Sequence, residues 1–212
     1  MMNMKVIGII GRSGSGKTTV IEKLISAFVS KGYSVGTLKD LKRTDYQMDT
    51  EGKNTFRHKQ AGAEPVTARA ELNTDIMFTH RLEADELLRF YHNDIVLLEG
   101  FRDFEIPQLL TGIDDQQLQD KFTDSVIAVS GIYAAENAEW QGLPCFNALT
   151  DIEALCSFIL QNVPEYGEEL PTLWLDGKEL PLSYGTRKEL ATFLKDDKII
   201  LEYKGKVREN ED

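Results

Sequence analysis

The sequence predicts an α/β protein with a doubly wound, mostly parallel sheet and flanking helices. Two observations support this prediction. Apolar segments of strand length alternate along the chain with segments of helical periodicity, which is the pattern of parallel sheets covered by helices. The chain has 212 residues, of which 42% are hydrophobic, enough for one core with room for a small appendage.

The chain opens with a predicted strand–helix–strand unit. Residues 4–10 form an apolar run typical of a strand that is buried on both faces. Residues 18–30 carry apolar side chains at helical spacing and end before Gly32, and residues 34–38 form a second strand. Because such crossovers are right-handed and join parallel strands, we expect these two strands to be parallel.

The next segment, residues 40–53, is polar and charged, and we predict a long loop. Loops of this length in compact domains are usually either functional or mobile. After it we expect a short helix at residues 54–61 and two strands, at 64–70 and 73–79, that form a hairpin. An amphipathic helix is predicted at residues 83–91.

The second half of the main domain repeats the alternation of strands and helices. A third buried strand is predicted at residues 94–98, and further strands at 123–129 and 144–147. A helix at residues 151–162 is expected to close the domain.

A change of composition divides the chain into a main domain, residues 1–163, and a small appendage, residues 164–212. Asp176 and Gly177 tolerate positive φ and indicate a hairpin turn. A helix is expected to begin at Thr186 with a capping box. The expected linker, hairpin strands and last strand are residues 164–170, 172–175, 179–182 and 199–203.

Charge and composition exclude several classes of partner. The net charge is −11, so we expect no nucleic-acid or membrane-surface partner, because phosphate groups would repel most of the exterior. The sequence contains no run of about 20 apolar residues and no signal-peptide layout, which favours a cytoplasmic protein. Cys145 and Cys156 lie in apolar surroundings and are predicted to be buried free thiols.

The most informative motif is the Gly-Arg-Ser-Gly-Ser-Gly-Lys-Thr segment at residues 11–18, a P-loop or Walker A pattern. It stands between a predicted strand and a predicted helix, where backbone N–H groups converge on phosphate oxygens. We expect Lys17 to bridge the β and γ phosphates and the Thr18 hydroxyl to bind Mg²⁺. The fold is therefore of the P-loop NTPase type. The predicted nucleotide-binding residues of this segment are Gly11, Arg12, Ser13, Gly14, Ser15, Gly16, Lys17, Thr18 and Thr19.

A P-loop also needs an acid on the metal side, at the carboxyl end of a neighbouring strand. Glu99 follows the third strand at that end, whereas Asp94 precedes the strand and would lie more than about 15 Å away. We therefore predict Glu99, with Lys17, as a catalytic residue and Glu99, with Thr18, as a metal ligand. Asp40, at the end of the second strand, is a further metal candidate, although a polar loop-entry residue explains it almost as well.

A cationic cluster formed by Lys53, Arg57, His58 and Lys59 surrounds a predicted helix start. Such a cluster either meets a second anionic ligand or forms a solvated face.

Several stretches together resemble the MobB family, the GTP-binding adaptors of molybdopterin-guanine dinucleotide biosynthesis. They are residues 11–19, Lys39, residues 97–102 and the Gly-Lys-Asn-Thr-Phe-Arg-His-Lys-Gln-Ala-Gly-Ala segment at residues 52–63. The last segment is far more specific than the P-loop. The resemblance covers residues 4–162.

The resemblance implies a homodimeric P-loop protein that binds GTP with Mg²⁺ and hydrolyses it slowly or not at all. It implies work with the molybdopterin guanylyltransferase that attaches GMP to molybdopterin, with molybdoenzyme chaperones as further partners. It places Lys53, Arg57 and His58 near the nucleotide or the molybdopterin phosphate, and Glu99 at the metal.

The chain departs from the family pattern at three places. Residues 40–42 are Asp-Leu-Lys, where the family commonly has histidines, and Gln108 stands where a lysine is usual. Residues 130–132 are Ser-Gly-Ile, without an Asp that could accept hydrogen bonds from guanine N1 and N2. Guanine and adenine both remain open on the sequence alone.

Two other functions share the same loop. A small-molecule kinase needs a lid with arginines, and Arg69 and Arg81 are too scattered to identify one. A dimeric ATPase switch is the second alternative, because Arg12 follows the first glycine of the loop, where some such ATPases carry a lysine that reaches across a dimer.

Overall fold

A central sheet with helices on both faces forms the body of the molecule. The structure, a computed structural model, describes residues 4–41, 52–167, 173–175, 178–179, 186–187, 190 and 194. The strands of the central sheet are β1 (Lys5–Gly11), β2 (Val35–Lys39), β5 (Ile95–Glu99), β6 (Gln108–Thr111), β7 (Val126–Ser130), β8 (Glu139–Trp140) and β9 (Leu143–Phe146). The helices are α1 (Lys17–Ser30), α2 (Asn54–Gln60), α3 (Ala84–Leu88), α4 (Asp115–Lys121), the short 3₁₀ helix η1 (Tyr133–Ala135) and α5 (Ile152–Asn162).

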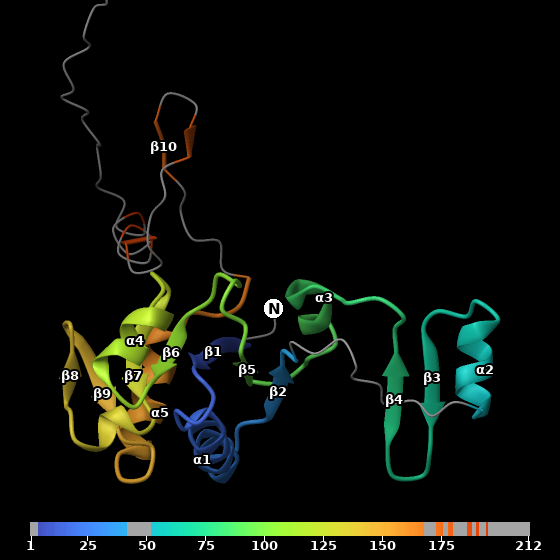
Figure 1. The fold of residues 1–212 in the computed structure, drawn as a ribbon, viewed down its shortest axis with the longest axis horizontal. Helices are drawn as coiled ribbons and strands as arrows, with labels where there is room; N and C mark the ends of the chain where they lie inside the picture. The colour runs from blue at the N-terminus through green and yellow to red at the C-terminus, as the bar shows by residue number, and fades with distance from the viewer. Residues whose placement is uncertain are drawn as a thin grey trace, which may run out of the picture.

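The strand order across the sheet is β2-β5-β1-β6-β7-β9-β8 (Figure 1). All neighbouring strands are parallel except β8 and β9, which form an antiparallel pair. The predicted α/β class with a mostly parallel sheet is therefore confirmed. The carboxyl ends of β1, β2 and β5 meet at one edge of the sheet, and α1 starts there.

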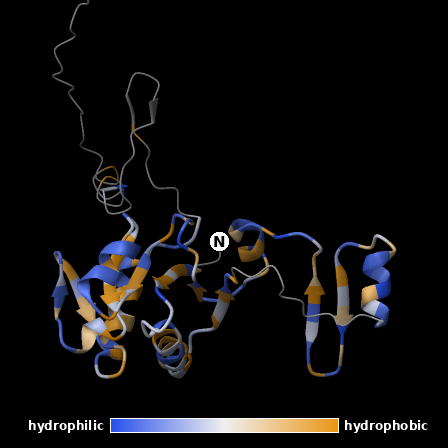
Figure 2. Ribbon diagram, in the orientation of Figure 1, coloured by the Kyte–Doolittle hydropathy of each residue, from blue (hydrophilic) through white to orange (hydrophobic). Residues whose placement is uncertain are grey.

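The core lies on both faces of the sheet because successive side chains of a strand point to opposite sides. Ile7 and Ile9 of β1 pack with α1 and α5 on one face. Val6 packs with α3 and Ile10 packs with α4 on the other face. Figure 2 shows the central strands coloured mainly as hydrophobic and α4 mainly as hydrophilic. This two-sided burial explains why the strands read as continuous apolar runs in the sequence.

The predicted strands and helices of the main domain agree with the structure within a few residues, but β6 was not predicted. Gln108 and Thr111 make the ends of this strand polar, although both side chains are fully buried. The Gln108 side-chain amide donates to the Phe101 carbonyl over 3.3 Å, and its oxygen accepts from Thr123 over 2.6 Å. Buried polar side chains with such partners are stable in a core, but they hide a strand from a reading based on hydrophobicity.

Three further elements, α4, η1 and β8, were not predicted. Helix α4 is capped by the Asp114 carboxylate, which accepts from the backbone N–H of Gln117 over 2.8 Å. Its one fully buried residue is Leu118, so its apolar periodicity is too weak to show in the sequence. The other two elements have only three and two residues.

A hairpin lobe, residues 52–79, stands apart from the central sheet in Figure 1. It consists of α2 and the antiparallel strands β3 (Val66–Arg69) and β4 (Thr74–Met77), as predicted. Within the described residues, β3 and β4 pair only with each other. The Glu64 carboxylate accepts hydrogen bonds from the backbone N–H and the hydroxyl of Thr79 at the open end of the hairpin, where β3 begins and β4 ends.

The beginning of the C-terminal segment is attached to the main domain. Glu165 forms an antiparallel bridge with Lys5, and the backbone N–H of Tyr166 donates to the Met4 carbonyl over 2.6 Å. The described part of the predicted linker is therefore held against the amino end of β1.

The predicted hairpin of the appendage is present as β10 (Trp174–Leu175) and β11 (Lys178–Glu179), an antiparallel pair. Residues 186, 187, 190 and 194 are helical, as the predicted helix start requires. Residues 42–51 of the predicted loop and the predicted strand at 199–203 lie outside the described residues, and the domain division at residue 163 stays a prediction. No helix in the described ranges has the length and apolar character needed to cross a membrane.

Candidate functional site

The P-loop joins the end of β1 to the start of α1 through glycines in conformations that other residues rarely adopt. Gly11 has φ 145°, Gly14 has φ 79° and Gly16 has φ 96°. A Cβ atom placed on Gly11 would lie 2.2 Å from the Thr111 carbonyl oxygen. Glycine is therefore required at position 11 by both backbone angle and space, and the loop packs directly on β6.

Ser15 fixes the loop from inside. Its side chain is fully buried, and its hydroxyl donates to the Arg12 carbonyl over 2.8 Å. It also lies 2.6 Å from the hydroxyl oxygen of Thr111, which donates to the Ile10 carbonyl. The Ser15 hydroxyl thus stabilises the curled conformation of the loop from inside. Because this hydroxyl is already hydrogen bonded, Ser15 can contact a phosphate only through its backbone N–H.

The Lys17 side chain folds back over the loop. Its ammonium group donates to the carbonyls of Gly11, over 3.0 Å, and Arg12, over 2.6 Å. Partial burial lowers the pKa of Lys17 below its ordinary value, and the nearby Glu99 carboxylate acts in the opposite direction. A partly desolvated ammonium group gains more from a phosphate oxygen than a fully hydrated one does.

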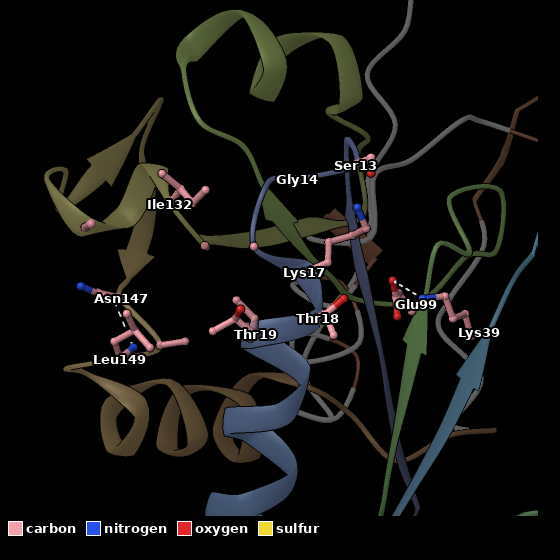
Figure 3. A pocket seen from close by; sticks show the side chains of 15 residues that line it. Ser13, Gly14, Lys17, Thr18, Thr19, Lys39, Glu99, Ile132, Asn147 and Leu149 are labelled. Carbon is pink, nitrogen blue, oxygen red and sulfur yellow. Dashed lines mark hydrogen bonds and ion pairs between the residues drawn. The ribbon is translucent and has the colours of Figure 1, made fainter.

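A cavity of about 610 Å³, which we call the phosphate cavity, opens in front of the loop. Figure 3 shows Lys17, Thr18 and Glu99 around one part of it and Ile132 and Leu149 around another. Its lining residues are Ser13, Gly14, Gly16, Lys17, Thr18, Thr19, Val20, Lys39, Glu99, Gly131, Ile132, Ala135, Asn147, Ala148 and Leu149. One end of the cavity is therefore polar and the other largely apolar.

Glu99 lies at the carboxyl end of β5, as predicted from the direction of the strand. Its carboxylate forms an ion pair with the Lys39 ammonium group at 3.1 Å, and its side chain is 16% exposed. Asp94 lies at the opposite end, where its carboxylate accepts from the backbone N–H and the hydroxyl of Ser34. Of these two acids, only Glu99 lines the phosphate cavity.

The side chains fit a metal that is held mainly by its nucleotide. Among the described residues, no group of three or more His, Cys, Asp or Glu side chains could hold a metal ion by itself. Thr18 and Glu99 both line the phosphate cavity and offer a hydroxyl and a carboxylate. Mg²⁺ in nucleotide sites typically takes one or two protein oxygens and completes its shell with phosphate oxygens and water.

Asp40, the third metal candidate, lines a different cavity. It follows β2, and its carboxylate forms an ion pair with Arg81 at 3.2 Å. It does not line the phosphate cavity, although Lys39 lines both cavities. The described contacts thus give Asp40 a partner other than a nucleotide-bound metal, and its metal role stays a prediction.

The structure does not bring Lys53, Arg57 or His58 to the phosphate cavity of the same chain. All three belong to the hairpin lobe, at and within α2. Lys53 lines a separate cavity of about 550 Å³ with Asp75 and other residues of the hairpin lobe. Their predicted contact with a nucleotide therefore requires a second chain or a movement of the lobe.

Arg12 turns toward α4. Its guanidinium forms an ion pair with the Asp120 carboxylate at 2.5 Å, and its side chain is about half exposed. Arg102 donates to the backbone carbonyl of Asp120. In this chain Arg12 is therefore engaged by its own domain.

Sequence reasoning missed the apolar end of the phosphate cavity. Ile132 and Leu149 line it, yet 51% and 65% of these side chains are exposed. The Asn147 side chain accepts from the backbone N–H of Leu149 over 3.0 Å and orders the turn before α5. The sequence signal for this end is the aliphatic side chain of Ile132 in the Ser-Gly-Ile segment at residues 130–132.

The two cysteines are free thiols, as predicted. Cys156 is fully buried and Cys145 is partly buried, and burial raises the pKa of each to about 11. Both thiols are therefore protonated at neutral pH, which removes them as nucleophiles.

Comparison with known proteins identifies the family. The sequence model of MobB, described as molybdopterin guanine dinucleotide synthesis protein B, matches residues 6–131, more than half of the chain. The chain belongs to the MobB family. The match includes the P-loop, the hairpin lobe and Glu99, so the resemblance read from these segments is confirmed.

Relatives of the MobB family cover most of the main domain. A probable molybdopterin-guanine dinucleotide biosynthesis adapter protein of Bacillus subtilis is 32% identical over 164 residues, covering 74% of this chain and 92% of the relative. The adapter protein of Haemophilus influenzae is 36% identical over 110 residues, covering 50% of this chain and 61% of the relative.

Solved MobB structures share the fold. The crystal structure of Bacillus subtilis MobB matches with a TM-score of 0.61 at 26% identity, covering 76% of this chain and 98% of that one. A MobB homologue from Bacillus stearothermophilus matches with a TM-score of 0.55 at 24% identity, covering 75% and 100%. The second likeness concerns the fold alone.

We predict that Gly11→Ala destabilises the protein more than Gly14→Ala. Both changes place a side chain at positive φ, which costs about 1–2 kcal/mol. Only position 11 adds a collision with β6, since nothing lies within 4 Å of a Cβ at position 14, and overpacking adds about 1–3 kcal/mol. Urea denaturation measures both free energies of unfolding, and equal losses would contradict the contact between Gly11 and Thr111.

Proposed function

We propose that this protein is a GTP-binding adaptor that assists the attachment of GMP to molybdopterin in molybdenum-cofactor biosynthesis. It holds GTP with Mg²⁺ in the phosphate cavity, hydrolyses it slowly and works with a molybdopterin guanylyltransferase. The observation that carries this proposal is a complete P-loop, with Glu99 facing it, in a chain of the MobB family. The relatives named as adapter proteins support the role.

The polar end of the cavity suits a triphosphate. Backbone N–H groups at the start of α1 and the Lys17 ammonium group supply positive charge. Thr18 and Glu99 would hold Mg²⁺ through a hydroxyl and a carboxylate oxygen, and Mg²⁺ bound there would neutralise phosphate charge. Lys39 lines the same cavity and forms an ion pair with Glu99. If Glu99 bound the metal instead, the Lys39 ammonium group could contact a phosphate oxygen.

The apolar end of the cavity suits a purine base. Ile132 and Leu149 present exposed aliphatic side chains there, and contact with a flat base would bury both. No carboxylate among the described lining residues lies at the base end, so the aliphatic contacts there hold a purine without an acid that would accept from guanine N1 and N2.

Slow hydrolysis fits an adaptor better than a kinase. Glu99 is the one carboxylate among the described residues that line the phosphate cavity, and it is paired with Lys39. A kinase needs arginines that close over the phosphates, and the described lining of the cavity includes none. The dimeric ATPase alternative loses support because Arg12 is held by Asp120 of its own chain.

The hairpin lobe favours a homodimer. Leu72 at its turn is 95% exposed and Ile76 on β4 is 49% exposed, and both edges of the two-stranded sheet lack a partner among the described residues. A second copy would cover these apolar side chains and bring α2, with Lys53 and Arg57, toward a neighbouring chain.

Lys17→Ala is expected to remove most of the affinity for GTP. Hydrogen bonds from a charged group to phosphate contribute about 1.5–3 kcal/mol, so the dissociation constant should rise about ten- to a hundredfold. Isothermal titration with Mg²⁺ and GTP measures it. Lys23→Ala, an exposed residue of the same helix, is the matched control and should bind normally, and tight binding by Lys17→Ala would refute the assignment of the loop.

Glu99→Gln is expected to weaken GTP binding about tenfold more with Mg²⁺ present than with EDTA, because the amide is a poorer ligand for a hard cation. Asp94→Asn, the same chemical change at the other end of β5, should leave both affinities unchanged. If Glu99→Gln lowers the affinity equally in both conditions, Glu99 does not contact the metal.

The decisive test of the proposed function is a titration with GTP, ATP and GDP, each with and without Mg²⁺, followed by capture of a molybdopterin guanylyltransferase. We expect Mg²⁺-dependent preference for GTP, turnover far below the 1–100 per second typical of kinases, and retention of the guanylyltransferase. Stoichiometric phosphorylation of a metabolite, or failure to retain the guanylyltransferase, would reject the adaptor role.

A further inference from the structure

A second cavity lies beside the phosphate cavity, on the other side of Lys39. Its volume is about 480 Å³, and we call it the Asp40 cavity. Its polar groups come from Lys39, Asp40, His80 and Arg81. Its apolar wall is formed by Leu41, Leu82, Leu87 and Phe101. Lys39 lines both cavities. Two ligands, one in each cavity, would therefore be separated by the Lys39 side chain.

The Asp40 carboxylate is unusual among the polar groups of this cavity. Its side chain is only 8% exposed, and Oδ1 forms the ion pair with Arg81. Oδ2 is buried and accepts no hydrogen bond from any described residue. Buried polar atoms almost always have a partner, and a carboxylate without a full set of donors binds best to a ligand that brings N–H groups.

Asp40 is held firmly in this position. Its backbone N–H donates to the Glu99 carbonyl over 2.9 Å, which continues the pairing of β2 with β5. A Cβ on Gly100 would contact the Asp40 side chain at 3.8 Å, so the chain after β5 packs closely against it. Arg81, by contrast, is 63% exposed and has room to move aside for a ligand.

The surrounding groups restrict the chemistry of that ligand. A carboxylate with a free oxygen recognises a ring edge that presents adjacent N–H donors, as a 2-amino-4-oxopyrimidine does. The Phe101 ring and the leucines offer a surface for a flat heterocycle. Lys39 and Arg81 offer positive charge for an acidic substituent of the same molecule.

We propose that the Asp40 cavity is a pterin subsite, in which Asp40 accepts hydrogen bonds from the 2-amino-4-oxopyrimidine edge and Lys39 and Arg81 face the pterin's acidic substituent. This inference rests on the proposed function, because a protein that assists transfer of GMP to a pterin gains from holding both reactants. Guanine carries the same ring edge, and the phosphate cavity is the separate site for its nucleotide.

The test is a fluorescence titration of the full chain with pterin-6-carboxylate while Mg²⁺ and GTP are held at saturating concentration. Lumazine-6-carboxylate, which has an oxygen in place of the 2-amino group, is the matched ligand. We expect saturable binding of the pterin and at least about tenfold weaker binding of the lumazine, since the hydrogen bond to the carboxylate is lost. This comparison needs no substitution and so does not depend on the folding of a variant.

Asp40→Asn tests the carboxylate itself, with Asp124→Asn as the control. Asp124 is exposed and precedes β7 at the opposite edge of the sheet. We expect Asp40→Asn to lower the affinity for pterin-6-carboxylate about tenfold or more and to abolish its preference over the lumazine. Asp124→Asn should retain both properties.

Three results would overturn the pterin subsite. They are equal binding of pterin and lumazine, displacement of the pterin by guanosine at comparable concentration, and unchanged pterin affinity in Asp40→Asn. The proposed function fails separately: if GTP does not bind but the pterin binds through Asp40, the adaptor role is rejected and the subsite stands. If GTP binds and the pterin does not, only the subsite is rejected.

Discussion

The close approach of the P-loop to β6 is the constraint on which the site depends. Gly11 has no room for a Cβ atom beside Thr111, and the buried Ser15 and Thr111 hydroxyls are hydrogen bonded to each other. These contacts fix where the loop ends and therefore where α1 begins. The first N–H groups of α1 consequently lie at the carboxyl ends of the strands, where β5 ends at Glu99. A phosphate site arises there because backbone geometry and strand direction coincide.

The parts of this arrangement that depend on local sequence were predictable. The P-loop is a contiguous segment between a strand and a helix, and its glycines are needed at fixed positions. The direction of a parallel strand predicted that Glu99, and not Asp94, lies beside the loop, and Glu99 does line the phosphate cavity. Its roles at the metal and in catalysis stay predictions. The hairpin lobe was predicted as two strands for the same local reason, although nothing in those strands indicates that they stand apart from the main sheet.

The parts that depend on distant partners were not predictable. Gln108 and Thr111 look unfavourable for a central strand until their hydrogen bonds with Thr123 and Ile10 are known. The ion pair of Asp40 with Arg81 joins two residues that are separated in the sequence by the whole hairpin lobe. Periodicity records which side chains are apolar, but it carries no information about which polar side chains satisfy one another in the fold.

Charge pairing explains how so acidic a protein presents anion sites. Its net charge is −11, yet cations gather at one edge of the sheet, each beside a carboxylate: Lys39 with Glu99, Arg81 with Asp40 and Arg12 with Asp120. An anion that enters must compete with these carboxylates, which disfavours loose binding of any phosphate compound. A ligand binds better if it also brings a partner for the carboxylate, such as a metal ion for Glu99 or N–H donors for Asp40. One ion pair within the protein is then replaced by two interactions with the ligand, one at the cation and one at the carboxylate. Recognition then rests on matched chemistry rather than on net attraction.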